Sequence, residues 1–484
     1  MERRRRGTGV MPLAVMLLLT SACVMTCVCT ASGEPLERRP KNTSTVPAIV
    51  KAAYEYLESH LMTGARWGMP YHFYRPSLTK YSATQWLWDS GSHMITWSHR
   101  NVTNAILDLR TMLQLQHDDG FIPEEIYWGR EDENATVEKW LYYGNVQQAN
   151  NSQMPVLAHA LRAIFAASGN DTTLLREFVP KLVRYWDWWW NERMVGHHGL
   201  ISIMHGWESG LDASPLYDLA YNVTEPRPSL KQEYPKFEEL MYSYHFRYHW
   251  NRTVIMGRER DDSDGRTWDD WFIVEDVGVN SVYGAGWDIL GDLALAMGDN
   301  STADRCYAMA QTVTDNIIQH CWTDIPFPAD EPRHFVSYYK ARNGTWCPIM
   351  TETVQSVMVV MLPRLPLALV THVVEHQLRN QSRFGLPFPV PSVSRRELSF
   401  NPVFTIDLMW RGPSWAFPNW FIMDGLWLHG HRALLNDLMD RWIDMVRIGG
   451  IYEMYNPFTA APYGQEGLGM SCLIVDWLYR LGRV

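Results

Sequence analysis

Three carboxylates gather in one short segment of the sequence, "HGWESGLDASPLYD" (residues 205–218). They belong to Glu208, Asp212 and Asp218. Hydrolysis of a glycosidic bond needs one carboxyl group that protonates the leaving oxygen and a second that activates water or attacks directly. The Gly-Leu-Asp-Ala-Ser-Pro run interrupts any helix, so the acids are expected on a loop.

Asp212 is the candidate proton donor of this segment. It follows Trp207 and Gly210 on a turn that is not helical. An apolar neighbour disfavours the charged form of a carboxyl group and raises its pKa, as a catalytic acid requires. The alternative is that Asp212 only caps the turn before Pro215.

Glu453, in "GGIYEMYNPFTAAPYG", is the candidate for the second carboxyl group of the pair. Tyr452 and Tyr455 flank it, and an Asn-Pro turn signal follows. An acid among aromatic rings is either half of a buried pair or a functional group. The two carboxyls would come from distant parts of the chain, which leaves room for a sugar between them.

The segment "QWLWDSGSH" brings together Trp86, Trp88, Asp89 and His93. Asp89 could accept hydrogen bonds from sugar hydroxyls while the Trp88 ring stacks on the sugar. The alternative for Asp89 is a place in the first turn of a helix. A lone histidine such as His93 is more often part of a core than a catalyst.

A further segment, "WRGPSW", supplies Arg411 and Trp415. The guanidinium of Arg411 presents a planar fork of donors that suits a sugar or a carboxylate. It could equally be the structural ion-pair partner of one of the acids. No HExxH spacing occurs, and the sequence gives no reason to expect a metal or another cofactor.

Helical periodicity dominates the chain that must position these residues. We expect about a dozen helices, and runs of alternating β-branched residues are scarce. The segments that carry the helical pattern are 46–62, 101–116, 152–168, 172–194, 229–246, 279–298, 301–322, 353–378, 419–447 and 469–481.

The candidate residues fall in loops rich in Trp, Gly, Pro and acids between these segments, for example "YSATQWLWDSGSH" and "HDDGFIPEEIYW". Loops carry function when a rigid scaffold positions them. Helix pairs that alternate with such loops favour an all-α fold, an (α/α)6 barrel with one set of loops at one mouth. A helical solenoid is the alternative, but no fixed-period repeat is visible. We expect one catalytic domain over 45–484, with a charged insertion or lid at 247–271.

The N-terminal residues 1–33 read as a secretory signal peptide or signal anchor. A basic stretch is followed by an apolar stretch and then by small polar residues. We therefore expect a protein of the secretory pathway, secreted or in the lumen of the endoplasmic reticulum or Golgi, with membrane contact only if the segment stays as an anchor. The formal net charge of −10 makes nucleic acid an unsuitable partner.

Glycosylation sequons support this compartment. We expect several to carry glycans; they are Asn42, Asn101, Asn134, Asn150, Asn170, Asn222, Asn251, Asn300, Asn343 and Asn380. The cysteines outside the targeting segment are Cys306, Cys321, Cys347 and Cys472. Either one or two structural disulfides or buried thiols would account for them, and the sequence does not choose a pairing.

Taken in order, "QWLWDSGSH", "WESGLDASP", "MWRGPSW" and "YEMYNPFT" resemble glycoside hydrolase family 63, chiefly its short members of the glucosylglycerate and mannosylglycerate hydrolase type. The resemblance covers nearly everything after about residue 45. It implies an (α/α)6 barrel and an inverting α-glycosidase, most simply an α-glucosidase, acting on a small glycoside or oligosaccharide. It maps the general acid to Asp212 and the general base to Glu453, about 6.5–9.5 Å apart. Around the innermost sugar it places Trp88, Asp89, Gln153, Trp207, Gly210 and Trp415.

Departures from the family pattern fall at Ala213, Met409 and Ala460. None of them replaces either acid, so they bear on the outer subsites and the substrate. Three alternatives stay open: a trehalase-like enzyme, an N-glycan-processing glucosidase, and a catalytically inactive sugar-binding protein of the same fold. The other signatures of a trehalase are absent from this sequence, and N-glycan-processing glucosidases are normally much longer. Loss of one of the two predicted acids would favour an inactive sugar-binding protein, but both acids are present.

Overall fold

The computed structural model describes residues 43–81, 83–129, 148, 149, 151–221, 272–327, 333–341, 343–404 and 409–484. Lys41–Val484 form one compact unit, and the paragraphs below concern that unit alone. The expected insertion at 247–271 and the expected helix at 229–246 lie outside the described residues. In the part described, no helix is both long and apolar enough to span a bilayer.

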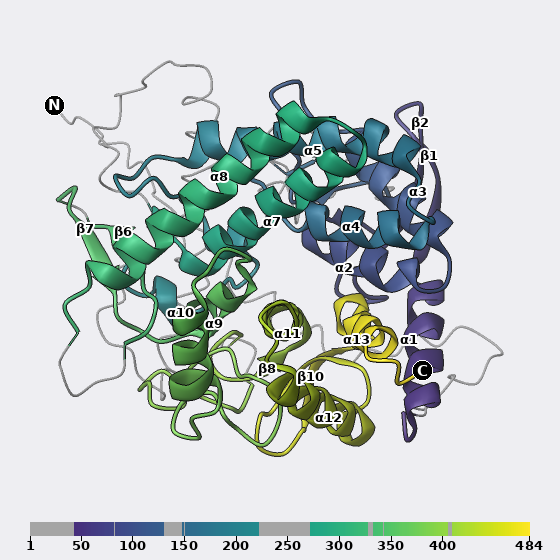
Figure 1. Cartoon of the computed structure of the whole chain (residues 1–484). Helices are drawn as coiled ribbons and strands as arrows, with labels where there is room; N and C mark the ends of the chain where they lie inside the picture. The colour runs from purple at the N-terminus through teal and green to yellow at the C-terminus, as the bar shows by residue number, and fades with distance from the viewer. Residues whose placement is uncertain are drawn as a thin grey trace, which may run out of the picture. The chain divides into compact units, whose positions relative to one another are not determined.

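Six helical segments form an inner ring (Figure 1). They are α2 (Leu87–Ser98), α4 (Leu157–Ala167), α7 (Val277–Ala296), α9 (Val354–Met358) with η9 (Val359–Met361), α11 (Ala416–Leu428), and η11 (Gly469–Leu473) with α13 (Ile474–Arg480). Each packs against the next, and η11 and α13 pack back against α2, so the ring closes. Neighbours cover these helices on nearly every side, and every residue of α2 is buried, its polar residues included.

A second set of helices covers this ring from outside. It comprises α1 (Val46–Ser59), α3 (Val102–Leu113), α5 (Thr172–Arg193), α8 (Asn300–Ile318), α10 (Leu367–Val373) and α12 (Arg432–Gly449). Helix α3 packs on α2, α5 on α4, α8 on α7, and α12 on α11. Helix α1, from the start of the chain, packs on η11 and α13 from its end, as Figure 1 shows in purple and yellow. The fold is the expected (α/α)6 barrel.

Short antiparallel strands lead into several inner helices. The strands are β1 (Leu61–Arg66), β2 (Met69–Tyr74), β3 (Gln85–Trp86), β4 (Glu125–Ile126), β5 (Val274–Glu275), β6 (Ser337–Lys340), β7 (Trp346–Ile349), β8 (Ser414–Trp415), β9 (Tyr452–Tyr455) and β10 (Pro462–Glu466). They form four small sheets, of which β10-β9-β8 matters most here. Because β3, β5 and β8 directly precede α2, α7 and α11, these strands hold the loops at the N-terminal ends of the inner helices.

Several expected boundaries were wrong, each for a local reason. Segment 46–62 is helical only to Ser59, because the residues after His60 pair in β1. Segment 353–378 divides at a Pro-rich turn, and 419–447 divides at Gly430, whose φ of 79° suits a glycine. The stretch "LWDSGSH", expected in a loop, begins α2 instead. Burial on every side hides the periodicity that would have marked this helix.

Candidate active site

The residues expected to do chemistry meet at the N-terminal ends of the inner helices. Trp88 and Asp89 lie in the first turn of α2, and Trp415 is the residue before α11. Glu453 lies in β9, which pairs with β8 beside Trp415. Asp212 comes from the loop that follows α5. Electrostatic interactions link Glu453 with both Asp89 and Asp212, so the three carboxyls share one site.

The pKa of Asp212 is raised to about 7, because desolvation and, to a smaller extent, the nearby Glu453 outweigh the opposing charge of Lys80. A carboxyl with this pKa keeps its proton near neutral pH, as a proton donor must. The loop around it is a short 3-10 turn, Gly206–Ser209, that ends at Gly210. The raised pKa of Asp212 therefore suits a proton donor.

Gly210 is required by its backbone and by its neighbour. Its φ is 71°, and a Cβ at this position would lie 2.6 Å from the Trp88 ring. The loop that carries Asp212 therefore packs directly against the Trp88 ring, which belongs to a group of neighbouring tryptophans. In this group, the ring centroids of Trp88 and Trp410 are 6.0 Å apart, and Trp410 stacks on Trp415 with ring centroids 3.8 Å apart. Trp207, within the same loop, is half-buried and packs edge-on against His205.

Glu453 is buried and held by a backbone donor. The N–H of Gln465, in the paired strand β10, donates to Glu453 Oε2 at 2.9 Å. Gly464 lies beside the same carboxylate with a φ of 72°, and a Cβ there would come within 2.3 Å of Oε2. Burial raises the pKa of Glu453, and Lys80 and the Gln465 N–H oppose the rise. The carboxylate is thus oriented by β10 and ready to accept a proton.

Asp89 has a raised pKa of about 8, caused first by desolvation and then by Glu453. Its position in the first turn of α2 matches the structural alternative considered from the sequence, and the position also brings it to the shared site. A protonated Asp89 would donate as well as accept a hydrogen bond, which suits a sugar hydroxyl.

Arg411 forms the ion pair that the sequence left open as its alternative role. It is 1% exposed, and its guanidinium binds both carboxylate oxygens of Asp218, with Nη1 at 2.9 Å from Oδ2. Its Nε donates to the Ala213 carbonyl at 3.0 Å, next to Asp212. Arg411 therefore fastens the acid loop to the segment before α11. Glu208 is likewise paired, with Arg193 at 2.7 Å.

Gln153 lies between the first turn of α2 and a further acid. Its Oε1 accepts from the Trp88 N–H at 3.0 Å, and its Nε2 donates to Glu124 at 3.3 Å. Burial raises the pKa of Glu124 well above its usual range, and Asp212 is the charge that contributes most. Sequence reasoning missed Glu124, although it lies in the acidic loop "HDDGFIPEEIYW" that was singled out.

Lys80 is the second residue that sequence reasoning missed. It is exposed, and its charge lowers the pKa of both Asp212 and Glu453. No motif surrounds it, so only the folded chain reveals its closeness to the two acids. His93, by contrast, is a buried core residue beside Tyr74, with a pKa lowered to about 3 by burial.

No cluster of three metal ligands occurs in the described ranges. Cys306, Cys321 and Cys472 are buried, in line with the thiol alternative, and Cys347 is half-buried. A barrel with aromatic walls and paired carboxyls at one mouth defines a glycoside hydrolase, and comparisons with known proteins agree. Residues 81–471 match the profile of the mannosylglycerate hydrolase MGH1-like glycoside hydrolase domain. The chain belongs to this family, within glycoside hydrolase family 63.

Relatives of known activity are distant but cover most of the chain. Mannosylglycerate hydrolase of Rubrobacter radiotolerans is 24% identical over 79% of this chain and 87% of its own length. Glucosylglycerate hydrolase of Mycolicibacterium hassiacum is 22% identical over 81% and 91%. A mannosylglycerate hydrolase of Thermus thermophilus, solved with glucose, superposes with a TM-score of 0.69 at 22% identity, covering 89% of this chain and 99% of that one. This structural likeness confirms the fold.

Proposed function

We propose that the protein is an inverting α-glycosidase in which Asp212 is the general acid and Glu453 the general base. The observation that carries the proposal is the raised pKa of Asp212, about 7, in a site shared with Glu453. Asp212 gives its proton to the glycosidic oxygen as the bond breaks. Glu453 takes a proton from the water that attacks the anomeric carbon from the opposite face, and the product has the β configuration.

The substrate we propose is a small α-glucoside or α-mannoside with an acidic aglycone. The distant relatives are named mannosylglycerate and glucosylglycerate hydrolases, which favours a hexose joined to a small acid. Lys80 supports this choice, because its charge lies near the two catalytic carboxyls and would offset the repulsion between them and an anionic substrate.

The test is hydrolysis of α-glucosylglycerate, α-mannosylglycerate, trehalose and maltose, with the anomer of the released sugar followed by NMR. We expect release of the β-anomer from at least one glycerate glycoside. Asp212→Asn and Glu453→Gln should each reduce kcat by at least about 100-fold. Asp118→Asn, at an exposed position, is the matched control and should retain activity.

Release of the α-anomer would refute inversion and the role of Glu453. Activity that survives Asp212→Asn would refute the assignment of the acid. If sugar binds but no substrate turns over, the inactive sugar-binding alternative is favoured instead.

We also propose that the chain enters the secretory pathway and is glycosylated. Four of the sequon asparagines in described residues, Asn101, Asn170, Asn300 and Asn343, are exposed, and Asn380 is half-buried. Expression in a eukaryotic secretory host should give a protein whose mass falls on treatment with an N-glycanase. An unchanged mass would contradict glycosylation, and N-terminal sequencing of the product would report whether residues 1–33 are removed.

A further inference from the structure

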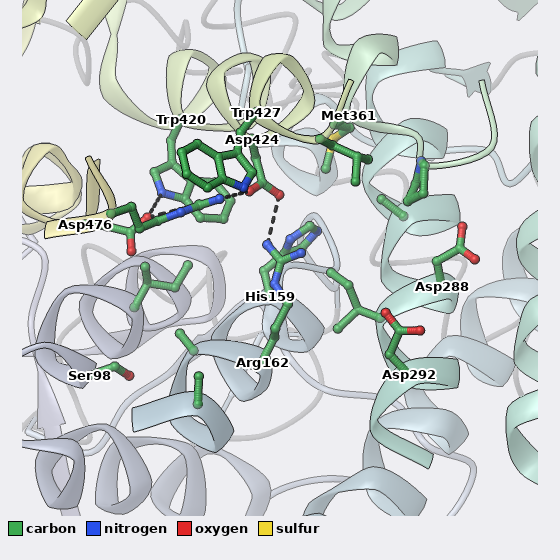
Figure 2. A pocket seen from close by; sticks show the side chains of 18 of the residues that line it. Ser98, His159, Arg162, Asp288, Asp292, Met361, Trp420, Asp424, Trp427 and Asp476 are labelled. Atoms are coloured by element: carbon green, nitrogen blue, oxygen red, sulfur yellow. Dashed lines mark hydrogen bonds and ion pairs between the residues drawn. The ribbon is translucent and has the colours of Figure 1, made fainter. Parts of the chain in front are cut away.

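A cavity of about 900 Å³ lies at the C-terminal ends of the inner helices, away from the catalytic residues (Figure 2). Its charged groups bind one another. Asp424 accepts hydrogen bonds from Arg162 at 2.9 Å and from Arg480 at 2.8 Å. Asp476 accepts from the Trp420 indole N–H at 2.7 Å. These contacts point to no ligand, and the feature that bears on function lies at the opposite mouth of the barrel, in strand β10.

Strand β10 contains a β-bulge opposite the proposed general base. The register of the β9–β10 pair is given by two facing pairs, Tyr463 with Met454 and Glu466 with Tyr452. By this register, two residues of β10, Gly464 and Gln465, stand opposite the single residue Glu453 of β9. Bulges of this kind are frequent beside active sites, where they redirect the groups of the bulged strand.

The bulge directs a backbone donor at the Glu453 carboxylate. The Gln465 N–H donates to Glu453 Oε2 at 2.9 Å. A regular ladder joins backbone groups to backbone groups, so this contact from a strand N–H to a side chain of the neighbouring strand depends on the bulge. The same N–H lowers the pKa of Glu453, which burial raises. The conformation of the bulge therefore bears on both the direction and the pKa of this carboxylate.

Helix α1 holds the end of the bulge. The Tyr56 hydroxyl donates to Oε1 of Glu466, the residue directly after the bulge. Tyr56 is 8% exposed, so little water competes for this hydrogen bond. The next residue, Gly467, packs on the same ring, because a Cβ at this position would lie 2.2 Å from Tyr56 Cδ1. Its N–H donates to the Ile451 carbonyl at 2.7 Å. The chain on this side of the bulge is thus fixed between α1 and the start of β9.

We infer that Tyr56 is a positioning residue for the general base, acting through Glu466 and the bulge of β10. The inference rests on the proposed function, because it takes Glu453 to be the base. The Tyr56 hydroxyl fixes Glu466, the fixed end of the bulge holds Gln465, and the Gln465 N–H orients the Glu453 carboxylate. Loss of the hydroxyl would release the end of the bulge and weaken the last of these contacts.

The test is the pH dependence of kcat/KM in Tyr56→Phe, with the glycoside of the panel above that is hydrolysed fastest. This variant keeps the ring against Gly467 and removes only the hydroxyl. Because Glu453 must be ionised to act as a base, activity rises with pH through its pKa. A weaker hydrogen bond from Gln465 raises this pKa, so the acidic limb should move to higher pH by about 0.5–1 unit.

The basic limb of the profile should stay in place. The charged groups that interact with Glu453 are Lys80, Asp89 and Asp212, and Tyr56→Phe changes none of them. A shift confined to the acidic limb therefore identifies an effect on Glu453, whereas a changed charge at Lys80 acts on both acids.

Two substitutions of Glu466 and one matched control separate positioning from a general loss of stability. Glu466→Gln retains an oxygen that accepts from Tyr56, so its acidic limb should not move to higher pH. Glu466→Ala removes the acceptor and should reproduce the shift of Tyr56→Phe. Tyr54→Phe removes a buried hydroxyl of the same helix, which donates to the Thr96 carbonyl at 3.1 Å. It should lower Tm and leave both limbs in place.

An acidic limb that stays in place in both Tyr56→Phe and Glu466→Ala, or that moves equally in Tyr54→Phe, would overturn the role of Tyr56. Failure of the proposed function gives a different result, since Glu453→Gln would then retain activity or no glycoside would be hydrolysed. The pKa of Glu453 can also be measured without turnover, by 13C NMR of carboxyl-labelled glutamate with Glu453→Gln assigning the signal. We expect a higher value in Tyr56→Phe than in the wild type, and equal values would overturn the inference.

Discussion

At the scale of single residues, the site depends on three carboxyls and one lysine. Burial raises the pKa of Asp89, Asp212 and Glu453, and repulsion by Glu453 adds to the rise at Asp89 and Asp212. Lys80 opposes the rise at Asp212 and Glu453. The lysine therefore affects the pH range in which Asp212 is protonated and Glu453 ionised, which is the state that the proposed inverting mechanism requires.

Replacing Lys80 should move the pH profile. In Lys80→Met the opposing charge is gone, so the pKa values of both acids rise and both limbs of the kcat/KM profile shift to higher pH. The shift should be less than about one unit, because Lys80 is exposed and screened by solvent. Lys51→Met, at an exposed position on α1, is the control. A profile that stays in place, or moves to lower pH, would show that Lys80 does not act on these acids.

Asp212 should also cost the protein stability at neutral pH. Its pKa is about 7 in the folded chain, against an ordinary value of 3.8. The folded state therefore holds a proton that the unfolded state releases, and the resulting stabilisation is lost as pH rises from about 4 through 7. Asp212→Asn lacks this loss, so its Tm should exceed that of the wild type by several degrees at pH 8 and less at pH 4. A Tm difference that does not grow with pH would contradict the raised pKa.

At the scale of elements, the catalytic loop is held by the segment that precedes α11. Arg411 joins Asp218 and the Ala213 carbonyl, and all three groups are buried. The fork of a guanidinium can serve these acceptors together, while the single ammonium of a lysine cannot. Arg411 thus ties the loop that carries Asp212 to the segment before α11.

Arg411→Lys should therefore disturb both folding and catalysis. We expect a loss of about 3 kcal/mol in the free energy of unfolding, since a buried carboxylate loses its matched partner. We also expect kcat to fall by at least about tenfold, since small misplacements of a catalytic group are costly. Denaturant unfolding and kinetics would measure the two effects. Arg110→Lys, in an exposed pair with Glu177, should cost no more than about 1 kcal/mol. Similar costs in both variants would argue against a special role for Arg411.

At the scale of the whole unit, its first helix covers the last inner segment of the barrel. Helix α1 follows residue 45 in sequence but packs on η11 and α13 at the C-terminus. A buried side-chain contact supports this closure, because the Tyr54 hydroxyl donates to the Thr96 carbonyl of α2 at 3.1 Å. Without α1, the outer face of the last inner helix would be exposed to water.

Loosening α1 should lower the stability of the barrel as a whole. Leu57 is fully buried on α1, so Leu57→Ala should cost about 2–5 kcal/mol in the free energy of unfolding. Because Leu57 lies on an outer helix and outside the site, kcat should stay near the wild-type value at temperatures well below Tm. Lys51→Ala, exposed on the same helix, should be nearly neutral. A large drop in kcat with unchanged stability would contradict this separation of closure from catalysis.

Much of this arrangement could be predicted from the sequence. The 3.6-residue pattern marked the outer helices, because one face of each is buried and the other is solvated. The order of the short motifs predicted the (α/α)6 barrel, the family and the enzyme class, all of which are confirmed. The pattern failed at α2, whose residues are buried all round and so carry no alternation of apolar and polar positions.

The acids themselves were visible in the sequence, since chain breakers and aromatic residues surround Asp212 and Glu453. The electrostatic environment of these two acids could not be predicted from the sequence. Lys80 is far from either acid in sequence, and the Glu124 whose pKa Asp212 helps to raise lies on another loop. A pattern along the chain records burial and local conformation, whereas a pKa or a cavity depends on through-space neighbours, which only the closed ring of helices brings together.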